Sequence, residues 1–127
     1  MKKRRDPRPA VAVGHVSLPV TNVPGAVRHF ELHGMRTIVA RRDFAVLELR
    51  GGTHLVVKWT KRKPKRGAKA PFDLMVDDID VAWRACERNG MDPSAMRHDP
   101  VHRSFDVVGP DGYRITITSS HAGTRPV

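Results

Sequence analysis

The sequence has one cysteine, few aromatic residues and no long hydrophobic run. Cys86 alone cannot form an internal disulfide, which excludes a disulfide-stapled fold and favours a reducing compartment. No window approaches the roughly 18 consecutive apolar residues that a membrane span needs. The apolar run at 10–13, which follows a basic N-terminus, is too short for the core of a signal peptide. A chain of 127 residues can form one core but is too short for two ordinary domains, so we expect a single cytoplasmic domain.

Acidic residues are also scarce, because 13 Asp and Glu stand against 23 Lys and Arg, for a net charge of +10. Residues 1–8 carry +4 and residues 58–69 carry +7, so the rest of the chain is close to neutral. The two segments are typical of a solvated tail and loop. They would also suit phosphate contacts, which leaves a nucleic-acid or acidic-partner module as an alternative. Neither run interleaves its basic residues with a series of aromatic residues that would form a platform for bases. We expect Trp59 and Trp83 to be buried in the core.

The first half of the chain, residues 13–60, predicts a strand, a helix and three further strands. Asn22 and Pro24 favour a helix start, the helix runs from Gly25 to about His33, and Gly34 favours its end. Alternation of apolar and polar residues places the strands. The expected strands are 15–20, 36–40, 44–49 and 54–59.

The second half, residues 71–119, repeats this order about 55 residues later. Asp77 and Asp78 favour a helix start, and Gly90 favours its end. The helix between them carries one apolar stripe that includes Cys86, which we expect to be a buried thiol rather than a nucleophile. The expected strands are 72–76, a weak one near 94–97, 103–108 and 113–118.

The repeat predicts an α+β fold. Two tandem βαβββ modules would form a cup-shaped, barrel-like mixed sheet with the helices outside, because neither half can bury its sheet face alone. A basic linker at 61–70 would join the modules, with a flexible basic tail at 1–12 and a C-terminal tail at 120–127. The strand residues expected to pack under the helices are Val16, Leu18, Leu55, Val57, Trp59, Leu74, Val76, Ile115 and Ile117.

Three segments resemble patterns of one known superfamily. Residues 15–22 (HVSLPVTN) resemble its first strand, residues 72–80 (FDLMVDDID) its fifth strand, and residues 108–115 (VGPDGYRI) the turn before its last strand. Over roughly residues 13–119 the chain therefore resembles the vicinal-oxygen-chelate superfamily of glyoxalases, bleomycin-resistance proteins and extradiol dioxygenases. The resemblance implies the same cup-shaped fold and a homodimer.

In enzymes of this superfamily, four positions facing the cup hold a divalent metal through His, Glu or Gln. The resemblance places these positions at His15, Val56, Pro71 and Thr116. Only His15 is a suitable ligand, because Val56 and Pro71 lack a donor side chain and Thr116 is a poor ligand for the usual transition metals. We therefore expect no metal or other cofactor. The alternative is an atypical ligand set of His15, Glu48 and His54 serving a metal-dependent lyase or dioxygenase.

The strand faces opposite the helices indicate what the cup would hold. Their polar, mostly basic character favours a small polar or anionic molecule, and which way Glu48 points stays open. The predicted ligand-binding residues are His15, Ser17, His54, Lys58, Asp73, Met75, Arg114 and Thr116. The leading hypothesis is thus a metal-free, glyoxalase- or bleomycin-resistance-like binding protein, with no catalytic residue assigned.

Overall fold

The computed structural model describes residues 5–120, 123 and 125–126. The predicted tails at 1–12 and 120–127 therefore lie partly outside the described residues. The first module consists of β1 (His15–Val20), α1 (Val23–Leu32), β2 (Arg36–Ala40), β3 (Phe44–Glu48), a single 3-10 turn (Arg50–Gly52) and β4 (His54–Trp59). The second consists of β5 (Lys69–Val76), α2 (Ile79–Arg88), β6 (Arg97–His98), β7 (Arg103–Val108), another 3-10 turn (Pro110–Gly112) and β8 (Arg114–Ser119).

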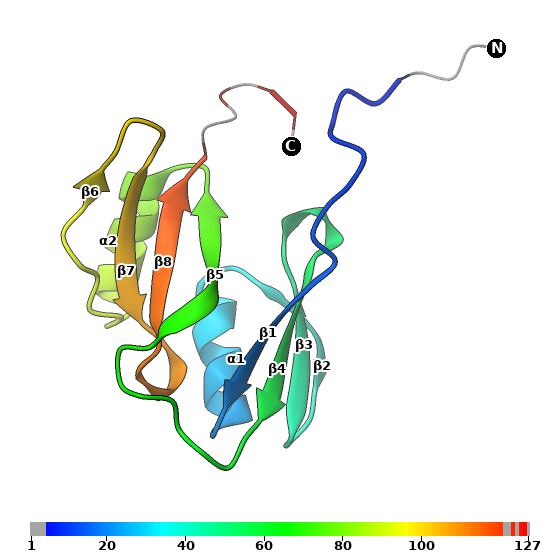
Figure 1. The fold of residues 1–127 in the computed structure, drawn as a ribbon, viewed down its shortest axis with the longest axis vertical. Helices are drawn as coiled ribbons and strands as arrows, with labels where there is room; N and C mark the ends of the chain where they lie inside the picture. Colours follow the sequence, from blue (N-terminus) through cyan, green and yellow to red (C-terminus); the bar gives the residue numbers. More distant parts are fainter. Residues whose placement is uncertain (1–4, 121–122, 124, 127) are drawn as a thin grey trace.

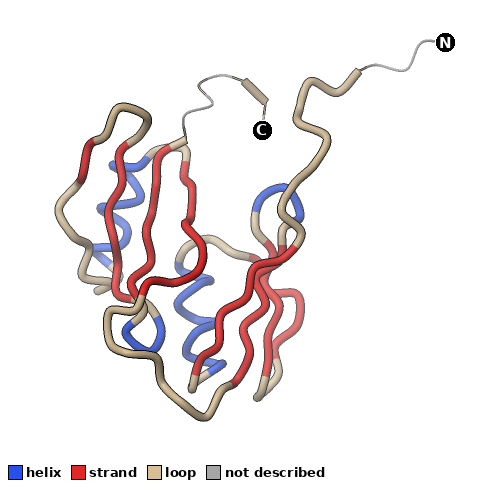
Figure 2. The backbone as a smooth tube through the Cα atoms, viewed as in Figure 1, coloured by secondary structure: helices blue, strands red, loops and turns tan. Residues whose placement is uncertain are grey.

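Each module folds into one four-stranded mixed sheet, and Figures 1 and 2 show how the two sheets are arranged. The strand orders are β1-β4-β3-β2 and β5-β8-β7-β6, with β1 parallel to β4 and β5 parallel to β8. The sheets do not close into a barrel, and together they form an open, cup-like arrangement. The predicted α+β fold of two βαβββ modules is confirmed. No helix among the described residues is long and apolar enough to cross a membrane.

Both helices begin at the caps that the sequence predicts. The Asn22 side chain accepts a hydrogen bond from the Gly25 N–H at 3.1 Å, and the Asp78 carboxylate accepts one from the Val81 N–H at 3.1 Å. Asn22 and Asp78 thus satisfy N–H groups that have no partner within the helix. Just after α1, Gly34 adopts a φ of +96°, a left-handed conformation that glycine tolerates best.

Two strands differ from the prediction by more than one residue at a boundary. β5 begins at Lys69 rather than at Phe72, because Lys69 already pairs with Arg114 of β8, so the connector between the modules shortens to residues 60–68. The weak strand expected near 94–97 is reduced to the two residues of β6.

The helix-facing residues of both sheets belong to one continuous core. Leu18, Leu55 and Ile115 are completely buried, and Phe30 of α1 meets Phe72 of β5 across the seam between the modules, with ring centroids 6.3 Å apart. Cys86 is buried as expected.

Trp59 is the exception among the predicted core residues, because its side chain is 54% exposed. It is the last residue of β4, where the sheet gives way to the exposed connector, so strand alternation no longer predicts burial there. The expectation that Trp59 is buried was therefore wrong.

Asp111, in the turn before β8, ties the second module to the first. Its carboxylate accepts hydrogen bonds from the N–H and the hydroxyl of Thr21, both at 2.6 Å. The neighbouring Tyr113 hydroxyl donates to the carbonyl of Pro19 at 2.9 Å. Asp111 holds a φ of +55°, a region that Asp and Asn tolerate better than other residues with a side chain.

Replacing Asp111 with Ala should lower the free energy of unfolding by about 2–3 kcal/mol, since two part-buried donors lose their acceptor and Ala fits the left-handed conformation poorly. Asp111→Asn keeps an acceptor oxygen and the backbone preference, so it should cost less than half as much. Urea unfolding at neutral pH measures both values. Equal losses for the two variants would contradict the assigned role of this carboxylate.

Candidate functional site

The polar face of the first sheet brings together His15, Glu48 and His54, the residues of the atypical ligand set. β1 and β4 pair His15 with His54, and their ring centroids lie 5.7 Å apart. Glu48 of β3 lies opposite His54, with 3.8 Å between its carboxylate and His54 Nε2. Glu48 therefore points to this face, which the sequence left open. Arg36 donates a hydrogen bond to the Glu48 carboxylate, and this interaction chiefly lowers the pKa of Glu48.

These donors do not form a metal centre. Among the described residues, no three His, Cys, Asp or Glu side chains converge closely enough to hold a metal ion. Arg36 already occupies the Glu48 carboxylate. At the fourth superfamily position, the Thr116 hydroxyl donates to Asp106 at 2.8 Å. The residues present therefore do not fit the metal site of the superfamily's enzymes.

The polar face of the second sheet is organised around Asp106, which the sequence reasoning missed. Its carboxylate, 13% exposed, accepts two hydrogen bonds from Arg97 at 2.8 and 3.0 Å and lies 3.7 Å from the Arg114 guanidinium. Burial opposes ionisation of Asp106, but the hydrogen bonds from Arg97 and Thr116 outweigh it and lower the pKa. Asp106 could have been identified as part of this polar face from its position on β7 opposite Thr116 of β8.

The eight predicted ligand-binding residues thus divide between two faces. His15, Ser17, His54 and Lys58 lie on the first sheet, and Asp73, Met75, Arg114 and Thr116 lie on the second. Within the second set, Arg114 and Thr116 share Asp106, whereas Asp73 lies 3.9 Å from Lys69 Nζ.

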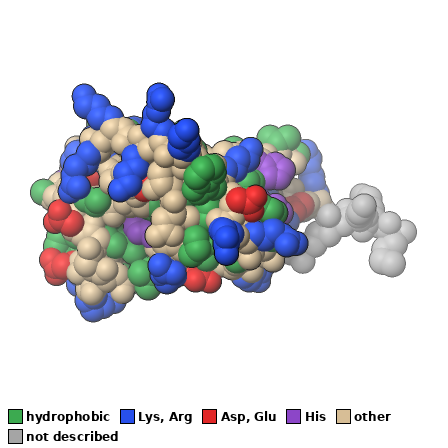
Figure 3. All heavy atoms as spheres, turned by 90° about the horizontal axis from the view of Figure 1, so that it is seen from below, with side chains coloured by type: hydrophobic (Ala, Val, Ile, Leu, Met, Phe, Trp, Pro, Cys, Tyr) green, Lys and Arg blue, Asp and Glu red, His purple; other side chains and the backbone are tan. Residues whose placement is uncertain are grey.

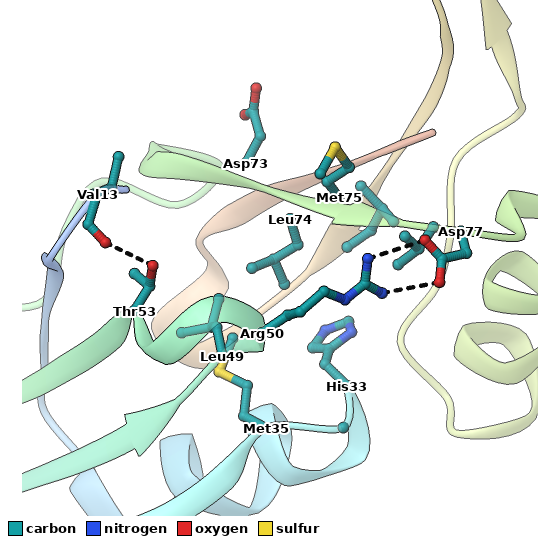
Figure 4. A pocket seen from close by; sticks show the side chains of 13 residues that line it. Val13, His33, Met35, Leu49, Arg50, Thr53, Asp73, Leu74, Met75 and Asp77 are labelled. Carbon is teal, nitrogen blue, oxygen red and sulfur yellow. Dashed lines mark hydrogen bonds and ion pairs between the residues drawn. The ribbon is translucent and has the colours of Figure 1, made fainter. Parts of the chain in front are cut away.

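A pocket of about 580 Å³ opens at the seam between the modules. It takes in only Asp73 and Met75 of the predicted ligand-binding residues. Figure 4 shows the Asp73 carboxylate pointing away from Arg50, while Leu74 points toward the interior. The lining residues are Val13, His33, Gly34, Met35, Leu49, Arg50, Thr53, Asp73, Leu74, Met75, Val76, Asp77 and Ile117.

An ion pair spans this pocket from one module to the other (Figure 4). Arg50, in the turn before β4, donates two hydrogen bonds of 3.0 Å to the carboxylate of Asp77, just after β5. The two side chains are 56% and 74% exposed. An exposed ion pair of this kind adds little stability, so either side chain can leave the pair and bind another charged group at little cost. Nothing local in the sequence pointed to Arg50.

A pair of histidines lies at the C-terminal end of α1, and one of them lines the pocket. His29 Nε2 and His33 Nε2 are 3.0 Å apart, so one ring donates to the other. Burial lowers the pKa of each to about 4, and for His33 the neighbouring His29 lowers it further. Both rings are therefore neutral near pH 7, and among the described residues Arg50 is the only cationic group lining the pocket. The i, i+4 spacing of the two histidines on a helix was the missed signal.

Comparison with protein-family models and with curated proteins finds no match. Solved structures do match. The chain is similar to a possible glyoxalase from Bacillus cereus (TM-score 0.67, 21% identity, 85% of this chain and 98% of that one). It is also similar to a lactoylglutathione lyase from Agrobacterium tumefaciens (TM-score 0.72, 13% identity, 92% of this chain and 99% of that one). A third similar structure is that of a glyoxalase/bleomycin resistance protein/dioxygenase from Alicyclobacillus acidocaldarius (TM-score 0.67, 16% identity, 91% of this chain and 94% of that one). The chain therefore has the fold of the vicinal-oxygen-chelate superfamily.

Proposed function

We propose that the protein binds a small molecule with an apolar body and an acidic group in the pocket between its modules, without a metal. The observation that carries the proposal is the reach of the Arg50 guanidinium across a pocket of about 580 Å³ with largely apolar walls. That volume suits a small organic ligand, and such sites combine apolar walls with a few polar groups that orient the ligand.

The acidic group of the ligand would take the place of Asp77 at Arg50. A guanidinium binds a carboxylate or sulfonate through two parallel hydrogen bonds, as Arg50 now binds Asp77. Because Asp77 is 74% exposed, it can turn to solvent when it is displaced. The neutral rings of His29 and His33 add no charge beneath the ligand.

A metal-independent mode is supported by the donor set. Of the four superfamily positions, only His15 carries a side chain that suits a transition metal. The names of the structural neighbours include a lyase and a dioxygenase, and one fold can host unrelated chemistries. Metal analysis of purified protein tests this part. About one equivalent of zinc, nickel, manganese or iron, lost in His15→Ala, would overturn it and favour the metal-dependent enzyme.

Two fluorescent probes of similar shape test the pocket: 1-anilinonaphthalene-8-sulfonate, which is anionic, and N-phenyl-1-naphthylamine, which is neutral. Met75→Trp should fill part of the pocket and weaken both probes about tenfold. Asp77→Asn should tighten only the sulfonate several-fold, because Arg50 loses its competitor. Arg50→Gln should weaken only the sulfonate by about tenfold, the value of one charge-assisted contact. Fluorescence titration at pH 7.5 gives each Kd.

Val81→Trp provides the matched control, because Val81 is exposed on α2 and does not line the pocket. It introduces the same indole as Met75→Trp and should leave both Kd values unchanged. The proposal fails if Met75→Trp and Val81→Trp change the Kd values by the same factor. It also fails if Arg50→Gln, or Asp77→Asn, changes the Kd of the anionic probe and that of the neutral probe by the same factor.

A further inference from the structure

A second hollow, of about 390 Å³, lies beside the N-terminal half of α1, whereas the pocket between the modules lies beside its C-terminal end. Arg28 of α1 contributes one side of this hollow, and Arg41 and Arg42 in the turn between β2 and β3 contribute another. The remaining lining residues are Pro24, Val27 and Ala40. Three guanidinium groups therefore surround one shallow apolar depression.

Within the part of the chain that the structure describes, the three arginines have no acidic partner. All three are exposed, and none takes part in an ion pair with any described residue. This sets them apart from Arg36, Arg50, Arg97 and Arg103, each of which contacts a carboxylate. Arg41 is placed over the ring of Phe44, 5.9 Å from its centroid. Unpaired guanidinium groups around a hollow are free to bind an outside anion.

Trp59 lies against the same turn. Its backbone N–H donates to the backbone carbonyl of Asp43 at 2.8 Å, and Asp43 directly follows Arg42. Trp59 is 54% exposed, whereas tryptophan is highly buried on average. Trp59 therefore brings an exposed aromatic residue to the turn that carries Arg41 and Arg42, and the connector begins directly after it.

The connector extends the basic surface. Its five basic residues are all exposed, and no described ion pair involves them; they are Lys61, Arg62, Lys63, Lys65 and Arg66. Figure 3 views this end of the molecule and shows that Lys and Arg side chains outnumber acidic ones there. The described part of the N-terminal tail leaves from the opposite end (Figure 1). The basic surface therefore comprises α1, the β2–β3 turn and the connector, without the tail.

We propose that this basic surface binds single-stranded nucleic acid. The unpaired arginines and the connector would contact successive phosphates, and Trp59 would stack on a base. Positive charge along a backbone path, combined with an exposed aromatic ring, is the arrangement that binds single strands without sequence preference. In a duplex the bases stay stacked on one another, so none of them is free to stack on the Trp59 ring. This activity is separate from the pocket between the modules, since it involves none of its lining residues.

Fluorescence polarisation with a labelled oligodeoxythymidine of about 20 nucleotides tests the proposal, at several salt concentrations. Arg41→Gln/Arg42→Gln should weaken binding at least tenfold at about 50 mM salt and should reduce the slope of log K against log salt by about 1.4. The matched control is Arg84→Gln/Arg88→Gln, which removes two exposed charges from α2 of the other module. It should change affinity less than twofold.

Trp59 is tested separately from charge. Trp59→Leu should weaken binding of the oligonucleotide about fivefold or more, because leucine cannot stack on a base, and Trp59→Phe should restore most of the affinity. A duplex of the same length should bind more weakly than the single strand. Absence of binding at about 50 mM salt, equal affinity for the duplex, equal losses in the two arginine doubles or no effect of Trp59→Leu would each overturn the proposal. Thermal unfolding of every variant confirms that the fold is retained.

Discussion

The double variant His29→Gln/His33→Gln should remain equally stable between pH 7 and pH 5, whereas the unaltered protein should lose about 3 kcal/mol over the same interval. Burial holds the pKa of both imidazoles at about 4 in the folded protein, against 6.5 for an ordinary histidine. Glutamine carries no charge in this interval and can still form a hydrogen bond between neighbouring turns of α1.

The direction follows from which state binds more protons. Between pH 6.5 and about 4 the unfolded chain protonates both histidines, while the folded protein keeps them neutral. The free energy of unfolding therefore falls as the pH falls through this interval, and the contribution is fully present above pH 6.5. Protonation would also place a second positive charge beside Arg50, since His33 lies next to that guanidinium in Figure 4.

Urea unfolding at pH 7, 6 and 5 measures the effect. Carboxylates change little in this range, because an ordinary Asp or Glu titrates near pH 4. His98→Gln is the matched control, since His98 is exposed on β6, and it should keep the full acid sensitivity of the parent. The prediction is contradicted if the double variant loses as much stability on acidification as His98→Gln does.

The fold could be predicted because its determinants are local. Alternation along 15–20 and 54–59 fixes the faces of β1 and β4, and the capping residues Asn22 and Asp78 fix both helix starts. The same alternation places His15 and His54 on one face. Alternation fails at strand ends, however, where Trp59 has no element to cover it.

The pocket could not be predicted, because it depends on how the modules meet. Arg50 and Asp77 are 27 positions apart and belong to different modules, so no periodicity relates them. His33 enters the pocket only because α1 ends at the seam. The homodimer and the cytoplasmic location rest on family resemblance and composition, and they stay predictions; sedimentation equilibrium would test the dimer.

Phe30→Ala should lower the free energy of unfolding by about 3–5 kcal/mol, the cost of a large cavity in a core that cannot collapse around it. Phe30 is completely buried on α1. Its ring packs edge-on against His29 at 5.1 Å between centroids and meets Phe72 of β5 at 6.3 Å. The ring therefore joins the core of one module to the first strand of the other, and its loss should weaken both modules in one cooperative transition.

Two further variants separate this role from simple loss of apolar area. Phe30→Leu keeps most of the volume, so it should cost about 1–1.5 kcal/mol. Phe44→Ala removes the same ring from the polar face of β3, where Phe44 is only half-buried, and should cost about 1–2 kcal/mol. Urea unfolding followed by tryptophan fluorescence, which reports Trp59 in the first module and Trp83 in the second, measures all three. A Phe30→Ala loss no larger than that of Phe44→Ala would show that the seam does not depend on this ring.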